Sequence, residues 1–232
     1  MENVPIMTID GPSGSGKGTI SRAAARALGW ALLDSGALYR LVALAGRRAG
    51  ISLDDAAALA RLAKGLNLRF GSGSALEEVV WLDGQEVTAA IRSEAAGNDA
   101  SKVAAFPAVR AALLERQRRF AVPPGLVADG RDMGTVVFPH AEVKIFLTAS
   151  ADERAARRHK QLKEKGVTAT LAALSLEIAE RDLRDTTRAA SPLVASADAI
   201  LLDTTGMSVN AVVERVLTVA RERLSRGSMK DG

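Results

Sequence analysis

The residues whose types and spacing most clearly indicate chemistry lie near the start of the chain, in a glycine-rich stretch with a lysine close to its end. The stretch follows the pattern G-x-x-x-x-G-K, which is the phosphate-binding P-loop. Glycines there permit backbone conformations that direct successive N–H groups at an anion, and the lysine reaches the β- and γ-phosphates. We expect phosphate to bind to these nine residues: Gly11, Pro12, Ser13, Gly14, Ser15, Gly16, Lys17, Gly18 and Thr19.

The flanking residues supply the elements that such a loop needs. An apolar run from Ile6 to Asp10 predicts a strand before the loop, and helical spacing of apolar residues from Ile20 predicts a helix after it. Both flanks argue against a chance glycine-rich turn. The loop departs from the general pattern at Gly18, where Ser or Thr is usual, so the hydroxyl expected near Mg²⁺ comes one place later, at Thr19. A G-K-G-T ending is more typical of nucleoside monophosphate kinases than of GTPases.

A carboxylate at the end of a second apolar run fits beside this loop. The run from Gly125 to Ala128 predicts a buried strand that leads directly into Asp129. This is the Walker-B arrangement, in which a carboxylate holds Mg²⁺ through its water shell beside the P-loop. The sequence therefore predicts a magnesium site made by Thr19 and Asp129.

Arginines recur on one face of the helix expected from Ala151 to Lys165. Arg154, Arg157 and Arg158 follow helical spacing with Gln161, so their guanidinium groups share a face, where like charges repel unless an anion neutralises them. We interpret this segment as a lid over the nucleotide phosphates. The alternative is a solvated basic helix.

Polar residues also end another predicted strand and interrupt another predicted helix. Ser35, Tyr39 and Arg40 follow the strand from Trp30 to Asp34, at the sheet edge where ligands bind in open α/β folds; Arg40 either binds phosphate or is an exposed helix residue. The helix from Thr168 to Arg188 begins with apolar residues and continues with charged ones. Arg181 and Asp185 there line a polar cleft or form a plain surface salt bridge.

The order of the elements predicts the fold class. Five predicted strands alternate with helices, which implies an α/β, three-layer P-loop NTPase fold with a parallel five-stranded sheet. An alternating segment with an Asp83-Gly84 turn, then a helical stretch from Ile91 to Ala105 broken near Gly97, interrupts the alternation as an α+β insertion. The expected division is core 1–35, insertion 36–105, core 106–150, arginine-rich lid 151–166 and core 167–232.

Composition narrows the range of partners. The chain has 232 residues, a formal charge of +4, 3% aromatic residues and no cysteine. Without basic runs interleaved with aromatics we expect no nucleic-acid partner, and without a long apolar run or signal-like start we expect no membrane segment. The expectation is a cytoplasmic monomer that binds small polyanions.

The predicted chemistry is phosphoryl transfer. The sequence suggests no covalent nucleophile, metal cage or histidine acid–base pair, and phosphoryl transfer needs none, because it depends on positioning, Mg²⁺ and cationic stabilisation. The candidates for that stabilisation are Lys17, Arg131, Arg157, Arg158 and Arg188. Another small-molecule P-loop kinase and a non-enzymatic P-loop switch are the rival readings. A switch would need a base-reading N-K-x-D segment or a basic aromatic surface, and the sequence suggests neither.

Five motifs in this order resemble the bacterial cytidylate kinase family over nearly the whole chain: IDGPSGSGKGT, LLDSGALYR, ASKVAAFPAVR, ADGRDMGTVVFP and ERDLRDTTRAASPL. The resemblance implies that ATP and CMP or dCMP are converted to ADP and CDP or dCDP, with Mg²⁺, in pyrimidine nucleotide metabolism. It implies that the nine loop residues hold ATP phosphates, to which the spacing in the lid adds Arg154, Arg157 and Arg158. It places around the acceptor Ser35, Arg40, Ser101, Arg110, Arg131, Asp132, Arg181, Asp185 and Arg188, to which the strand-end position adds Tyr39.

The same resemblance suggests roles for these acceptor residues. Asp132 would accept a hydrogen bond from the cytosine amine while Arg110 donates to the ring, a pattern that rejects uracil. The sugar would contact Ser101, Arg181 and Asp185. The monophosphate would contact Arg40, Arg131 and Arg188.

Overall fold

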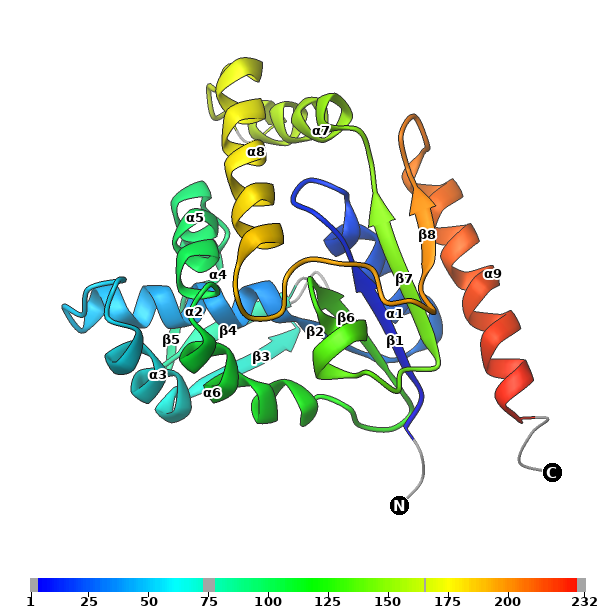
Figure 1. Cartoon of the computed structure of the whole chain (residues 1–232), viewed down its shortest axis with the longest axis horizontal. Coiled ribbons are helices and arrows are strands. Elements are labelled where there is room, and N and C mark those ends of the chain that lie inside the picture. Colours follow the sequence, from blue (N-terminus) through cyan, green and yellow to red (C-terminus); the bar gives the residue numbers. More distant parts are fainter. Residues whose placement is uncertain (1–3, 73–77, 165, 229–232) are drawn as a thin grey trace. The chain divides into compact units, whose positions relative to one another are not determined.

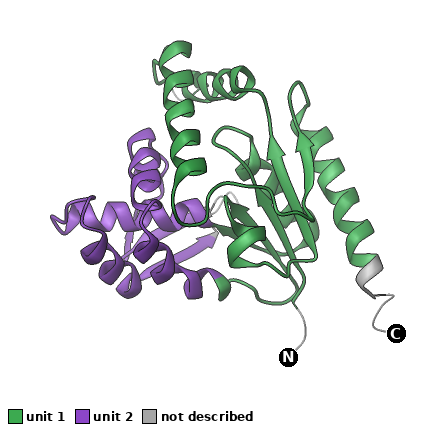
Figure 2. Cartoon of the chain, in the orientation of Figure 1, with its two compact units in different colours: residues 1–34, 118–232 green, residues 35–117 purple. Residues whose placement is uncertain are grey.

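The computed structural model describes residues 4–72, 78–164 and 166–228. The turn expected at Gly71 to Ser74 and the end of the basic helix at Lys165 therefore lie partly outside the described residues. The chain forms two compact units, unit 1 with residues 1–34 and 118–232 and unit 2 with residues 35–117 (Figure 2).

Unit 1 is built on the predicted parallel sheet (Figure 1). Its strands are β1 (Ile6–Asp10), β2 (Ala31–Asp34), β6 (Leu126–Gly130), β7 (Val143–Thr148) and β8 (Ile200–Asp203). They lie in the order β2-β6-β1-β7-β8 and every adjacent pair is parallel. The α/β class and the parallel five-stranded sheet are thus confirmed, and β1 occupies the centre.

Helices α1 (Lys17–Leu28), α7 (Ala151–Glu164) and α8 (Leu171–Thr187) begin close to where the sequence places them. Unit 1 also contains α9 (Val209–Ser228) and a short π-helix that the sequence does not predict, η1 (Met133–Val137). Thr170 caps α8, because its side chain accepts a hydrogen bond from Ala173 N at 3.2 Å. Gly29 in the left-handed conformation ends α1.

The two faces of β1 differ in chemistry because side chains alternate along a strand. Met7 and Ile9 are fully buried in an apolar core with residues of α1 and α9, among them Ile20 and Val216. Thr8 and Asp10 project from the opposite face and are also buried. A strand that fills the core on one side therefore presents polar groups on the other.

Unit 2 is the expected α+β insertion. It contains α2 (Ser35–Arg48), α3 (Ala56–Gly65), α4 (Thr88–Ile91), α5 (Glu94–Val103) and nearly all of α6 (Pro107–Arg118), with an antiparallel sheet of β3 (Leu68–Ser72), β4 (Glu78–Leu82) and β5 (Gln85–Glu86). Asp83 and Gly84 both have positive φ, 51° and 77°, as the predicted hairpin turn requires.

Two details of unit 2 differ from the sequence-based expectations. The helical stretch breaks at Arg92 and Ser93 and not near Gly97, because the Ser93 side chain accepts from Ala96 N and starts a new helix, α5, in which Gly97 is buried. Helix α6, expected in the core segment, belongs to unit 2. Its Arg116 donates a 2.9 Å hydrogen bond to Leu66 O beyond the end of α3.

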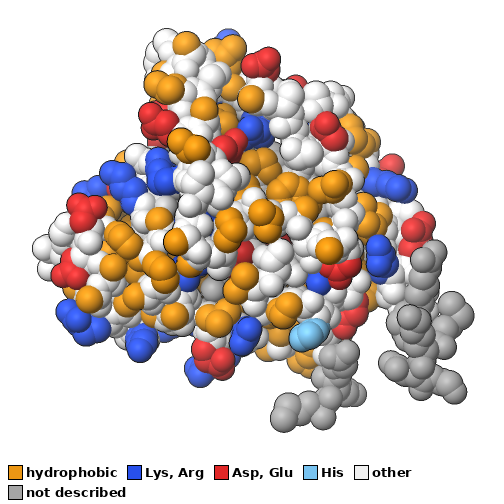
Figure 3. Space-filling model, in the orientation of Figure 1, with side chains coloured by type: hydrophobic (Ala, Val, Ile, Leu, Met, Phe, Trp, Pro, Cys, Tyr) orange, Lys and Arg blue, Asp and Glu red, His pale blue; other side chains and the backbone are white. Residues whose placement is uncertain are grey.

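The surface shows no segregation of apolar from charged side chains on the face seen in Figure 3. Among the described residues, no helix has both the length and the apolar character needed to cross a membrane.

Candidate active site

The P-loop connects the carboxyl end of β1 to the start of α1. Gly14 and Gly16 have positive φ, 76° and 88°, and Gly16 directly precedes α1. Gly11 lies so close to the neighbouring strand that an added Cβ would be 2.0 Å from Leu147 O. Lys17 opens α1 and donates from Nζ to Pro12 O at 3.1 Å. The glycines are thus required by backbone conformation and close approach.

The carboxylate of Asp129 lies beside the start of α1. A Cβ added at Gly18 would be 3.2 Å from Asp129 Oδ2 and 3.5 Å from a guanidinium nitrogen of Arg22. A Ser or Thr at this position would press against the Asp129 carboxylate, whereas its contact with Arg22 would have an ordinary length. Asp129 also pairs in register with Asp34 of β2, so two carboxylates end adjacent strands.

The charges at this point perturb one another. Burial raises the pKa of Asp129, with Asp34 acting in the same direction and Lys17 against it. Burial lowers the pKa of Lys17, and Arg131 adds to this effect while Asp129 opposes it. Perturbed ionisable groups of this kind are typical of functional sites. The pair becomes fully charged most easily when an anion meets Lys17 and a cation meets Asp129.

The oxygen donors beside the P-loop fit a divalent cation. Asp129 Oδ1 is buried and has no hydrogen-bond partner, so one carboxylate oxygen is left for a ligand. An oxygen donor next to the P-loop suits Mg²⁺. Thr19, the other predicted ligand, is exposed at the first turn of α1, and no cluster of three or more His, Cys, Asp or Glu is found among the described residues. The residues therefore fit a metal held largely through water and nucleotide oxygens.

Two arginines of α7 reach the P-loop. The buried Arg154 donates from Nη1 to Ser13 O at 2.9 Å and to Asp182 of α8 at 2.6 Å, and from Nε to Ala149 O at 3.1 Å. Arg157 donates to Ser15 O at 3.3 Å and to the backbone and hydroxyl oxygens of Thr204. The predicted lid arginines thus already contact the loop, but through its carbonyl groups.

The third lid arginine differs. Arg158 donates to Gln161 at 3.2 Å within α7. The acceptor of this hydrogen bond is therefore on the same helix as Arg158.

The end of β6 and the end of α8 form a network of paired charges. Arg131 Nε donates to Asp185 Oδ2 at 2.7 Å. Arg188 lies 3.9 Å from both Asp185 and Asp132, and all three of these side chains are at most 8% exposed. Arg131 and Asp132 are thus brought together with Asp185 and Arg188, which lie more than 50 positions further along the chain. Arg181 is on the same helix, and its Nε is buried without a hydrogen-bond partner.

Unit 2 carries the other predicted acceptor residues. The guanidinium of Arg110 lies 5.6 Å from the centroid of the Tyr39 ring and donates to Ala104 O at 3.3 Å. Arg40 donates to Ile91 O at 2.7 Å. The Ser101 hydroxyl is buried without a hydrogen-bond partner, and Ser35 is buried at the first position of α2. Buried polar groups of this kind favour a polar ligand over a purely structural role.

Sequence reasoning missed several residues that the structure places here. Arg22 and Asp34 flank Asp129, Asp182 holds Arg154, and Thr204 holds Arg157. The segment from Asp203 to Gly206 forms a turn in which Thr205 N donates to Asp203 at 2.9 Å. Asp34 had a usable signal, because it ends a predicted strand next to Asp129.

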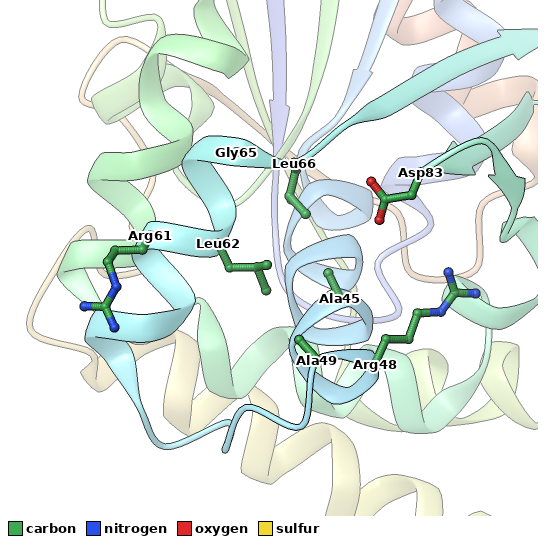
Figure 4. A pocket seen from close by; sticks show the side chains of 8 residues that line it. All are labelled: Ala45, Arg48, Ala49, Arg61, Leu62, Gly65, Leu66 and Asp83. Atoms are coloured by element: carbon green, nitrogen blue, oxygen red, sulfur yellow. The ribbon is translucent and has the colours of Figure 1, made fainter.

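A hollow of about 380 Å³ on unit 2 contains none of the predicted site residues (Figure 4). It is lined by Ala45, Arg48, Ala49, Arg61, Leu62, Gly65, Leu66 and Asp83. In Figure 4 the Leu62 side chain points toward α2 and the Arg61 side chain points away from it. The chemistry indicated by the sequence lies elsewhere.

Comparison with known proteins agrees with this geometry. The chain matches the family model described as cytidylate kinase over residues 7–222. It is 56% identical to a cytidylate kinase of Klebsiella pneumoniae over 223 residues, 96% of this chain and 98% of the relative. It is 53% identical to a cytidylate kinase of Colwellia psychrerythraea over 97% of this chain and 99% of the relative.

A solved gluconokinase from Sinorhizobium meliloti is 18% identical, with 97% of each chain covered and a TM-score of 0.47. The fold is therefore assigned from the chain's own sheet topology. The P-loop beside Asp129 and the match over nearly the full length lead to one conclusion: this chain belongs to the cytidylate kinase family.

Proposed function

We propose that this protein transfers the γ-phosphoryl group of ATP to CMP or dCMP, producing ADP and CDP or dCDP in pyrimidine nucleotide metabolism. Membership of the cytidylate kinase family supports a phosphotransferase that uses ATP as donor. The observation that carries the proposal is the placement of Lys17 next to Asp129 and Arg131 at the carboxyl end of the central sheet. Cations at that edge suit a polyphosphate.

The donor side consists of the P-loop and α7. The loop from Gly11 to Thr19 binds the phosphates through backbone N–H groups, and Lys17 neutralises the transferring group. Arg154, Arg157 and Arg158 add positive charge from α7. The free oxygen of Asp129, with Thr19, would hold Mg²⁺, which supplies charge neutralisation on the phosphate oxygens when bound.

Ten residues are predicted to contact the acceptor, five of them in each unit. From unit 1 come Arg131, Asp132, Arg181, Asp185 and Arg188, and from unit 2 Ser35, Tyr39, Arg40, Ser101 and Arg110. Asp132 accepts from the cytosine amine and Arg110 donates to the ring. Ser101, Arg181 and Asp185 bind the sugar, and Arg40, Arg131 and Arg188 bind the phosphate.

The chemistry then needs no covalent intermediate with the protein. A phosphate oxygen of CMP attacks the γ-phosphorus, the bond to the β-phosphate bridge oxygen breaks, and ADP leaves with that oxygen. Lys17 and Arg131 stabilise the charge that spreads over the transferring group. Arg131 is released from Asp185 as it turns to phosphate, while Arg188 remains close enough to Asp185 to compensate it.

The test is ADP release with ATP, Mg²⁺ and one acceptor at a time: CMP, dCMP, UMP, AMP or shikimate. The rate of ADP release with CMP or dCMP should exceed the rate with the other acceptors by orders of magnitude. Lys17→Ala should lower kcat by about 100- to 1,000-fold, since it removes one preorganised charge from the transition state. Lys64→Ala, at an exposed lysine of α3, is the control, and its kcat should equal that of the unaltered protein. Preference for shikimate, or no acceleration by any monophosphate, would contradict the proposal.

A further inference from the structure

Asp10, the last residue of β1, binds a segment that is distant in sequence. Its side chain is only 6% exposed. Oδ1 accepts a hydrogen bond from Met133 N at 2.9 Å, and Oδ2 accepts one from Gly134 N at 2.8 Å. Both oxygens of one buried carboxylate are thus used on two consecutive backbone N–H groups. Asp10 also directly precedes Gly11, the first residue of the P-loop.

The two N–H groups open the π-helix η1, which follows Arg131 and Asp132. The first N–H groups of any helix lack carbonyl acceptors within that helix. In η1 the carboxylate oxygens of Asp10 accept their hydrogen bonds instead. Asp132 is the residue before η1, and its carbonyl accepts from Val136 N at 2.9 Å and from Val137 N at 3.2 Å. Single π-helical turns are rare and are frequently found at functional sites. The anchor and the two predicted acceptor residues are therefore adjacent along one short segment.

The packing leaves this segment little freedom. A Cβ added at Gly134 would lie 2.8 Å from Thr8 Oγ1, 3.3 Å from Lys144 Cδ and 3.4 Å from Asp10 Oδ2. Glycine thus allows η1 to lie directly against the polar face of β1 and β7. Lys144 Nζ donates to Pro139 O at 2.6 Å just beyond η1, so both ends of the segment are held from the sheet.

We infer that Asp10 is a positioning residue for acceptor binding: it fixes Arg131 and Asp132 relative to the P-loop by holding the start of η1. The inference rests on the proposed function, because it takes Arg131 and Asp132 as contacts of the acceptor. Asp10 itself contacts neither substrate in this scheme. Its loss should therefore affect acceptor binding more than ATP binding, whereas a residue that merely stabilises the fold would affect both alike.

The first experiment compares Asp10→Asn with Asp54→Asn. The asparagine at position 10 keeps the shape but offers only one acceptor oxygen, so one N–H of η1 loses its partner. Asp54→Asn is the matched control, since it makes the same chemical change at an exposed carboxylate of unit 2. With Asp10→Asn we expect the KM for CMP to rise about tenfold, as for one lost charge-assisted hydrogen bond, and the KM for ATP to change less than about twofold. Asp54→Asn should leave both constants unchanged.

Hydrogen exchange gives a readout that is independent of turnover. The amides of Met133 and Gly134 should exchange faster in Asp10→Asn than in the unaltered protein, while those of the apolar face of β1 should not. Unchanged exchange at both amides would overturn the inference.

The second experiment displaces η1 from the other side. Gly134→Ala inserts a methyl group against Thr8 Oγ1 and should raise the KM for CMP without a comparable change for ATP. Thr8→Ala/Gly134→Ala removes the opposing hydroxyl and methyl groups of Thr8 and should restore the KM. Rescue of this kind requires that the distance between η1 and β1 sets acceptor affinity.

The outcomes separate the two claims. If the unaltered protein does not use CMP, the proposed function and this inference both fail. If it uses CMP and Asp10→Asn leaves the KM for CMP unchanged, or raises both KM values equally, only the inference fails. If Gly134→Ala raises the KM for CMP but the double variant does not restore it, the spacing between η1 and β1 is not what positions the acceptor residues.

Discussion

Two groups of arginines in unit 1 use their charge differently. Arg154 and Arg157 on α7 donate to backbone carbonyls of the P-loop and to Thr204. Arg131 and Arg188 are held by the carboxylates Asp185 and Asp132. Arg154 and Arg157 also pair with carboxylates, Asp182 and Glu153, so the contact with the loop carbonyls is what separates the two groups. We therefore expect the first group to brace the P-loop, whereas the proposed function assigns the second group to the acceptor phosphate.

Replacement of Arg154 should give the largest loss of stability. Arg154→Met removes the hydrogen bonds to Ser13 O and Ala149 O and leaves Asp182 without its guanidinium partner. Removing one partner of a largely buried pair costs about 3 to 5 kcal/mol in the free energy of unfolding, and the low end applies because Asp182 is partly exposed. Chemical denaturation measures the change. Arg158→Met, on the same helix, is the control and should change stability by under about 0.5 kcal/mol.

Equal losses of stability in Arg154→Met and Arg158→Met would remove the distinction between these two arginines of α7. The two groups of arginines would then differ only in the partners of their guanidinium groups.

Replacement of Arg131 should affect turnover more than stability. Arg131→Met should reduce kcat by about 100- to 1,000-fold, because one preorganised cation is lost from the transferring group. The loss of stability should be smaller than for Arg154→Met, since Arg188 stays 3.9 Å from Asp185. Turnover with saturating ATP and CMP gives kcat, and Arg131→Lys tests whether charge alone suffices. A variant with normal kcat but low stability would reverse the assignment of roles.

Two buried carboxylates of unit 1, Asp10 and Asp185, also differ in the direction of their pKa shifts. Burial raises the pKa of Asp10 from 3.8 to about 6, because its partners are backbone N–H groups that only partly oppose desolvation. For Asp185 burial also favours a higher value, but Arg131 outweighs it and the pKa is lowered. A raised folded-state pKa means a contribution to stability that is present below the unfolded value and lost as pH rises through the folded value.

The stability of wild type minus that of Asp10→Asn should therefore fall between pH 4 and pH 7, by at most about 3 kcal/mol for a shift from 3.8 to about 6. The matching difference for Asp185→Asn should be constant in this window and decline only as pH falls below 3.8 through the lowered folded pKa. Urea denaturation at several pH values measures both differences. If the two stability differences changed with pH in the same way, the predicted contrast between Asp10 and Asp185 would be wrong.

The sequence predicts the scaffold well because its signals are local. Short apolar runs identify all five strands of unit 1, and alternation with helices implies that they are parallel. The P-loop is recognisable because glycine is required where φ is positive. The division into domains and the individual roles of the site residues stay predictions.

What the sequence cannot supply is which partner each side chain chooses. Nothing local indicates that Arg154 binds Ser13 O, that Asp10 binds Met133 N, or that residues 133–137 form a π-helix. These depend on contacts between residues more than 100 positions apart in two of the three cases. The predicted break near Gly97 failed for a related reason, since the Ser93 cap competes with glycine as a boundary and its hydrogen bond decides.

The strand order also bears on how the chain is made. The central strand β1 is translated first, but it pairs only with β6 and β7, whose residues Leu126 and Val143 face Ile6 and Met7. At roughly 5 to 20 residues per second, synthesis from β1 to β7 takes on the order of 10 seconds. During that time unit 2 emerges whole, with its own local hairpin, while the phosphate loop has no sheet to hold it. The P-loop is thus translated early but packed against its sheet late. Until β6 and β7 have been made, the apolar strand β1 is unpaired on the nascent chain.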